Sequence, residues 1–132
     1  MKDCQRWLSE EWKRELEDSQ WKAETQLYLS VQKTFKNYTV IRHASPGWLA
    51  PQHYDIFIPE LGLAIEYMGQ QHYEPIDFFG GQLGFENTRD RDEKKARVSK
   101  ACGVTIHYVK YDEDMREAMN NIRKIYQQGE RH

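Results

Sequence analysis

The sequence predicts a single mixed α/β domain in which a sheet of about four strands is flanked by helices. Three observations support this fold class. Apolar residues recur at helical spacing over residues 5–36 and 112–127, and a charged helical pattern fills residues 87–102. Short runs typical of strands lie between these stretches, three before the middle helix and one after it. The predicted order of elements is therefore helix, three strands, helix, strand and helix.

The first helical stretch is predicted to form two pieces with a break near Asp18 and Ser19. Apolar residues recur every four positions in each piece: Leu8, Trp12 and Leu16, then Leu27, Val31 and Phe35. A chain of 132 residues is long enough for one ordinary core. We accordingly assign residues 1–18 to an N-terminal helical extension, 19–112 to the core and 113–132 to a C-terminal helix.

The three strands before the middle helix follow from short β-patterned runs. Residues 38–43 form the first, and residues 45–48, Ser-Pro-Gly-Trp, form the turn after it. Residues 55–59 and 63–67 are mostly apolar and flank residues 59–62, Pro-Glu-Leu-Gly, which predict a turn. We therefore expect these two runs to pair as a hairpin.

The second half of the chain alternates between polar and strand-like segments. Residues 74–86, rich in glycine and aromatic side chains, are predicted to be a loop, and loops of this length are often functional. The helix of residues 87–102 would be closed by Gly103, and residues 104–109 form the last strand. A final amphipathic helix is expected over residues 112–127.

Charge and cysteine content narrow the class of protein. Nineteen basic and 21 acidic residues give a net charge of −2, which argues against a purely electrostatic nucleic-acid binder but leaves room for a local basic surface. The two cysteines, Cys4 and Cys102, are far apart and exclude a zinc site built from cysteine; Cys102 is expected to be a buried helix thiol. No apolar signal region or membrane-length run is present, so we expect a cytoplasmic protein.

Asp55 and Glu66 are the strongest candidates for a functional pair. Each is the carboxylate of a strand that is otherwise fit for burial, and a hairpin that turns at residues 59–62 brings them to the same end of the sheet. Two such acids need a cation, and oxygen ligands suit Mg²⁺ or Mn²⁺. One or two such ions would activate water and stabilise a phosphate undergoing attack. The alternative is that each acid faces solvent, or that one pairs with an arginine.

Glu24 is a third candidate metal ligand, because it shares helical spacing with Tyr28, Val31 and Phe35 on the stripe that should face the sheet. A carboxylate on that stripe can reach over the end of the sheet and bind the metal directly or through water. The alternative is an ordinary glutamate at the edge of the stripe.

Gln71, His72 and Lys95 are candidates for handling water and phosphate. Gln71 would orient the attacking water, and His72 would donate to phosphate, shuttle a proton or ligate metal. Lys95, one turn from Asp92 on the charged helix, would neutralise the transition-state phosphate. A structural hydrogen bond at His72 and a surface ion pair between Asp92 and Lys95 are the alternatives.

The remaining histidines and aromatic residues are interpreted mainly as structural. This group comprises His43, His53 and His107 on strand patterns, and Trp48, Phe78 and Phe79 in loops. The three loop aromatics would suit stacking on unpaired bases, but we expect core packing.

Together these residues resemble the restriction-endonuclease-like superfamily, written PD-(D/E)XK, and most of all its small bacterial branch related to very-short-patch repair endonucleases. The matching segments are residues 55–59, the pattern Ile65-Glu66-Tyr67-x-Gly69-x-Gln71-His72, residues 91–95 and residues 103–106. The resemblance covers roughly residues 20–112.

This resemblance implies a restriction-endonuclease-like sandwich, in which a mixed sheet is flanked by helices, and Mg²⁺-dependent hydrolysis of DNA phosphodiester bonds. By that likeness Asp55 and Glu66 are metal ligands, with the main-chain carbonyl of Tyr67 as a third, and Glu24 matches the acid on the first core helix. The implied setting is bacterial DNA repair, restriction or mobile-element defence.

The sequence departs from the family pattern in three ways. Tyr54 replaces the proline before the first acid, and Met68 replaces the lysine two residues after the second, so Gln71 or Lys95 would have to take over its role. The chain also contains no separate DNA-recognition domain. Specificity must therefore come from loops such as residues 74–86, from a homodimer, or from a partner subunit or larger parent protein.

Met68 favours a rival function, a catalytically inactive module of this fold that binds DNA or a protein partner. A further rival is a structural or regulatory α/β domain whose acids are surface residues. It predicts that replacing Asp55 and Glu66 together by Asn and Gln leaves the stability of the chain unchanged, in Mg²⁺ and in EDTA alike.

Overall fold

The computed structural model describes residues 2–69, 72–73 and 80–130, with side chains described between residues 14 and 125 of those ranges. Its elements are α1 (Lys2–Thr34), β1 (Ile41–Ala44), β2 (Tyr54–Ile58), a 3₁₀ turn (Pro59–Leu61), β3 (Leu63–Met68), α2 (Gly81–Ala101), β4 (Thr105–Lys110) and α3 (Met115–Glu130). The predicted mixed α/β class and the order of elements are confirmed.

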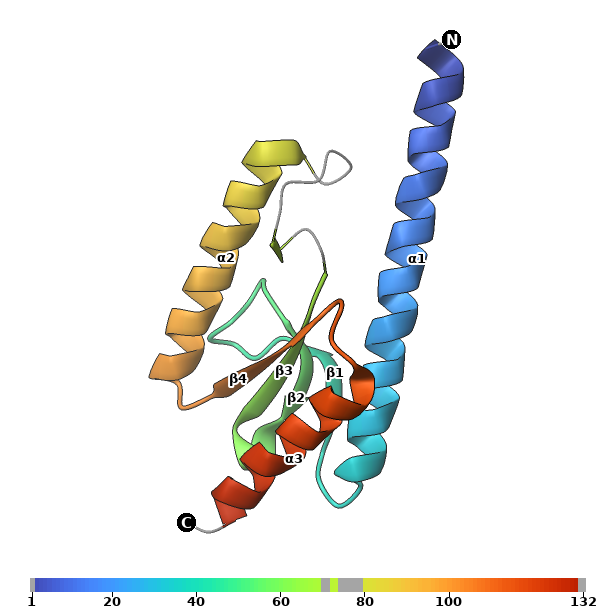
Figure 1. The fold of residues 1–132 in the computed structure, drawn as a ribbon. Coiled ribbons are helices and arrows are strands. Elements are labelled where there is room, and N and C mark those ends of the chain that lie inside the picture. The colour runs from blue at the N-terminus through green and yellow to red at the C-terminus, as the bar shows by residue number, and fades with distance from the viewer. Residues whose placement is uncertain (1, 70–71, 74–79, 131–132) are drawn as a thin grey trace.

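The four strands form one mixed sheet in the order β1-β2-β3-β4 (Figure 1). β1, β2 and β3 pair antiparallel, and β4 pairs parallel to β3 after the crossover through α2. The predicted hairpin turn lies at residues 59–62, where Gly62 has a left-handed φ of 57°. A Cβ added there would lie 3.1 Å from the Gly103 carbonyl oxygen, so this turn favours glycine both sterically and conformationally.

Helices cover both faces of the sheet and bury two apolar clusters. The cluster under α1 and α3 contains Leu27, Val31, Phe35, Ile56, Ile58, Leu63, Ile65, Val109, Ala118, Met119 and Ile122. The cluster on the α2 side contains Ala44, Leu49, Tyr54, Phe57, Ala64 and Val104. The Tyr54 hydroxyl and Ser99 Oγ lie 2.6 Å apart and join β2 to α2 inside the protein. Burial of these side chains fixes the strands that hold the candidate site.

The predicted break near Asp18 and Ser19 is wrong, because α1 runs unbroken from Lys2 to Thr34. Asp18 and Ser19 cost little in an exposed helix, and Lys22 Nζ pairs with Asp18 Oδ2 one turn away at 3.0 Å. The N-terminal half of α1 extends well beyond the sheet (Figure 1).

The predicted boundary between the loop of residues 74–86 and the next helix is also wrong in part. α2 begins at Gly81, so residues 81–86 are helical, while residues 74–79 lie outside the described part of the chain. Gly80, with a left-handed φ of 93°, precedes the helix, and its carbonyl accepts a hydrogen bond from Gly84 N at 3.1 Å. Cys102 is exposed rather than buried, because it follows the last residue of α2 in a surface turn.

Within the part of the chain that the structure describes, no helix combines the length and apolar character needed to cross a bilayer.

Candidate metal centre

The strand register places three of the polar side chains in one row. Ile56 pairs with Ile65 on β3 and with Arg42 on β1. Extending both registers by one residue puts Asp55 opposite Glu66 on one side and opposite His43 on the other. The hairpin thus brings the two acids to the same end of the sheet, as its geometry predicts.

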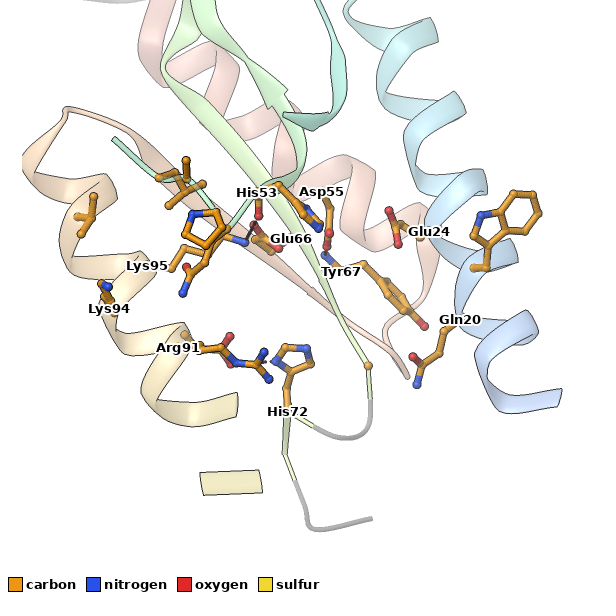
Figure 2. A pocket seen from close by; sticks show the side chains of 18 of the residues that line it. Gln20, Glu24, His53, Asp55, Glu66, Tyr67, His72, Arg91, Lys94 and Lys95 are labelled. Atoms are coloured by element: carbon orange, nitrogen blue, oxygen red, sulfur yellow. Dashed lines mark hydrogen bonds and ion pairs between the residues drawn. The ribbon is translucent and has the colours of Figure 1, made fainter. Parts of the chain in front are cut away.

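Asp55 and Glu66 of this row line a cavity of about 810 Å³ between α1, α2 and the β1–β2 connection. Figure 2 shows the side chains of Asp55, Glu66 and Tyr67 between Glu24 on the α1 side and Lys95 on the α2 side. The cavity therefore gathers side chains from both helices at the end of the sheet.

Glu66 is nearly enclosed, and its cation comes from α2. The Lys95 ammonium pairs with Glu66 Oε1 and donates a hydrogen bond to the His53 carbonyl oxygen, with side chains only 8% exposed for Glu66 and 15% for Lys95. Burial first, and then repulsion from Asp55, raise the pKa of Glu66 to about 8 against the opposing effect of Lys95. One lysine therefore does not fully compensate the negative charge of the row.

Asp55 belongs to a second group on the α1 side. Ligand atoms of Glu24, His43 and Asp55 all lie within 4.8 Å of one another. His43 Nε2 lies 2.6 Å from Glu24 Oε1, and Asp55 Oδ2 accepts a hydrogen bond from the Tyr67 main-chain N–H at 2.8 Å. Oxygen and imidazole donors at this spacing fit a divalent cation.

Glu24 sits where its helical spacing predicts, since Val31 and Phe35 of the same stripe are buried and Glu24 is half-buried. Its Oε1 atom contacts Arg42 Nε at 3.6 Å as well as His43. The structure thus brings Glu24 over the end of the sheet next to Asp55.

His43 was not among the predicted site residues. It lies in β1 with a left-handed φ of 53°, and its side chain is about half exposed. Its ring centroid is 5.3 Å from that of His53. The signal in the sequence is weak, because His43 meets Asp55 only through the β1–β2 register, and the long connection between those strands leaves that register open.

His72 is held by α2 through Asp92. His72 Nδ1 lies 2.8 Å from Asp92 Oδ2, and both side chains are half-buried. The alternative of a surface ion pair between Asp92 and Lys95 is wrong, because each contacts a different residue of the cavity. Gln71 lies outside the described residues, and the role of the Tyr67 carbonyl stays a prediction.

Two exposed tryptophans also line the cavity. Trp21 of α1 is 57% exposed and Trp48, in the β1–β2 connection, is 45% exposed. Trp48 contacts Phe57 edge-on with ring centroids 6.4 Å apart, so the expectation that it packs in the core is wrong for about half of its surface. The other two loop aromatics, Phe78 and Phe79, lie outside the described residues.

Comparisons with known proteins identify relatives but no family. No family model matches the chain, and no solved structure matches it significantly. Similar proteins are uncharacterized protein 033L of Invertebrate iridescent virus 3 (41% identical over 43% of this chain and 30% of that protein), 094L of Frog virus 3 (29% over 70% and 61%) and 307L of Invertebrate iridescent virus 6 (40% over 43% and 29%). Each match thus covers less than two thirds of the relative's length.

Proposed function

We propose that the chain is a Mg²⁺- or Mn²⁺-dependent nuclease that hydrolyses DNA phosphodiester bonds. The observation that carries this proposal is the convergence of four groups on one cavity: Asp55 and Glu66 from paired strands, Glu24 from α1 and Lys95 from α2. The order of elements and the mixed sheet agree with the restriction-endonuclease-like sandwich that the sequence resembles.

The donor set suits a hard or borderline divalent cation. Glu24, Asp55 and Glu66 offer carboxylate oxygens, and the excess of acids over cations around Glu66 gives a positive ion a favourable place. A divalent cation bound there would supply Lewis-acid stabilisation of the scissile phosphate.

Lys95 supports catalysis despite the loss of the motif lysine. Met68 occupies the usual position of that lysine and is buried, whereas the Lys95 ammonium reaches Glu66 from α2. We assign Lys95 the role of lowering the pKa of Glu66, which favours its ionised form, and of neutralising charge that develops on the phosphate.

His72 is assigned the proton transfer. Its Nδ1 is engaged by Asp92, which orients the ring and leaves Nε2 to exchange a proton with water or the leaving oxygen. Gln71 remains the proposed water-orienting residue.

The walls of the cavity suit a nucleic acid. Trp21 and Trp48 offer exposed rings for stacking on unpaired bases, and Arg91 and Lys94 of α2 offer positive charge to the backbone. The resemblance implies a setting in bacterial DNA repair, restriction or mobile-element defence, which we keep as part of the proposal. Pairing into a homodimer, or a partner subunit or larger parent protein, would supply specificity and the second cut in duplex DNA.

A second candidate function is a catalytically inactive module that binds DNA or a protein partner. Met68 is the observation that favours it. Such a module keeps the cleft and its tryptophans but shows no metal-dependent turnover.

The test is cleavage of plasmid and of single-stranded DNA with Mg²⁺ or Mn²⁺ by the natural chain, Asp55→Asn and Asp90→Asn. Asp90 is an exposed acid of α2 outside the cavity, so its variant controls for loss of one charge. We expect cutting by the natural chain and Asp90→Asn and none by Asp55→Asn. Absence of cutting by all three would select the inactive module.

A further inference from the structure

We propose that His43 is a nitrogen ligand of the cation at Glu24 and Asp55, and that it makes the site selective for Mn²⁺ over Mg²⁺. The inference rests on the proposed metal centre and adds a residue and a preferred ion. Mg²⁺ prefers oxygen ligands, whereas imidazole adds affinity for transition-metal ions.

The spacing of the three side chains matches a coordination sphere. Neighbouring ligand atoms of an ion with bonds of about 2.1 Å lie about 3 Å apart, and opposite ones about 4.2 Å. The 2.6 Å contact between His43 Nε2 and Glu24 Oε1 is close to the shorter value, and the three ligand atoms lie within 4.8 Å of one another, a limit slightly above the longer value. Small side-chain rotations would let an ion take the place of the hydrogen bond between His43 and Glu24.

Three different elements hold these ligands, and each is anchored independently. Glu24 lies one turn before Leu27, a fully buried residue of α1, and Asp55 is fixed by the hydrogen bond from Tyr67 N at 2.8 Å. His43 follows Arg42, whose guanidinium donates to Thr25 Oγ1 at 2.8 Å. The group is therefore held in place before an ion arrives.

Charge around the group favours a cation from solution. None of the described ion pairs includes Asp55, because Lys95 is bound to Glu66 instead. Arg42 touches Glu24 at 3.6 Å, but its guanidinium also lies 5.8 Å from the Trp21 ring centroid. Two carboxylates with one edge contact from an arginine leave net negative charge for an ion to neutralise.

The simpler explanation is that His43 and Glu24 form an ordinary ion pair, since the His43 side chain is 48% exposed. Such pairs add little stability. This explanation predicts that a bound ion has only oxygen ligands and that its preference does not depend on His43.

The first measurement is electron spin-echo envelope modulation of the Mn²⁺-loaded protein, which detects a coordinated imidazole nitrogen. The second is the affinity for Mn²⁺ and for Mg²⁺, measured by calorimetry. The variants are His43→Asn and His53→Asn. Asparagine tolerates the left-handed φ of residue 43, and His53 is a matched control because its ring centroid lies 5.3 Å from that of His43.

We expect a nitrogen signal in the natural chain and in His53→Asn, its loss in His43→Asn, and a fall of about tenfold or more in the ratio of Mn²⁺ to Mg²⁺ affinity for His43→Asn alone. Mn²⁺ binding with no nitrogen signal, or a signal that survives in His43→Asn, overturns the inference and leaves the proposed nuclease standing. Absence of any Mn²⁺ or Mg²⁺ binding overturns both.

Discussion

The carboxylates on the two flanks of the candidate site differ in their burial and in the cations that contact them. On the α2 flank, Glu66 is enclosed and neutralised by the chain's own cation, Lys95. On the α1 flank, Asp55 and Glu24 are half-buried, Glu24 contacts His43 and Arg42, and no described ion pair reaches Asp55. The comparison suggests a division of tasks: the α1 flank holds most of the ion site, to which Glu66 adds a carboxylate, and Lys95 and His72 of the α2 flank position phosphate and move protons.

The largest expected effect on this comparison comes from replacing His72, the proposed proton carrier of the α2 flank. His72→Ala should lower the single-turnover cleavage rate about 10²- to 10⁴-fold, because it deletes the general acid–base group. Its Mn²⁺ affinity, measured by calorimetry, should stay unchanged. Asp92→Asn should give a smaller loss of rate, because His72 keeps its ring but loses its orienting carboxylate. If His72→Ala also lost affinity for Mn²⁺, His72 would belong to the ion site and the two flanks would not have separate tasks.

Removal of Lys95 tests whether the α2 flank depends on its internal cation. Lys95→Met leaves the enclosed Glu66 without a partner, so it should lower the free energy of unfolding at pH 8.5 by about 3 kcal/mol. Urea denaturation measures this loss. Lys94→Met, at an exposed neighbouring position, should change stability by about 0.5 kcal/mol or less. Equal stability of the two variants would show that Glu66 does not need the lysine.

The raised pKa of Glu66 predicts a pH dependence that is specific to this flank. The folded chain holds this proton more tightly than the unfolded chain, whose pKa is near 4.5. The resulting stabilisation is complete below pH 4.5 and is lost as pH rises through about 8. In EDTA, the melting temperature of the natural chain should therefore fall relative to that of Glu66→Gln between pH 5 and pH 9. A difference in melting temperature that stays constant with pH would show that the pKa of Glu66 is not raised in the folded chain.

The smallest effect concerns the walls that both flanks share. Trp48→Leu should weaken binding of a single-stranded oligonucleotide about tenfold, because one stacking surface is lost. Fluorescence anisotropy measures the affinity, and Leu83→Ala, at an exposed apolar residue of α2 outside the cavity, is the control. If both variants bind equally well, Trp48 does not contact the bases.

The hairpin shows what the sequence could predict. Two short apolar runs around a Pro-Glu-Leu-Gly turn allow essentially one register, and that register alone places Asp55 opposite Glu66. The helical stripe with Val31 and Phe35 likewise identifies Glu24. Local periodicity determines these positions, so they follow without knowledge of the rest of the fold.

The contacts that sequence reasoning missed all depend on long connections. His43 meets Asp55 across a connection of nine residues, 45–53, and Lys95 reaches Glu66 only once α2 has packed on the sheet. The unbroken α1 and the early start of α2 differ from the prediction because the rest of each helix outweighs its weak helix formers, such as Ser19 and Gly84, the latter at about 1 kcal/mol relative to alanine.

The most direct test of the central claim is thermal unfolding of the natural chain and of Asp55→Asn in EDTA, Mg²⁺ and Mn²⁺. An ion that binds only the folded chain raises its melting temperature in a concentration-dependent manner. We predict that both ions raise the melting temperature of the natural chain, Mn²⁺ at lower concentration, and that Asp55→Asn does not respond. Identical melting temperatures for the natural chain in EDTA and in saturating Mn²⁺ would contradict the account.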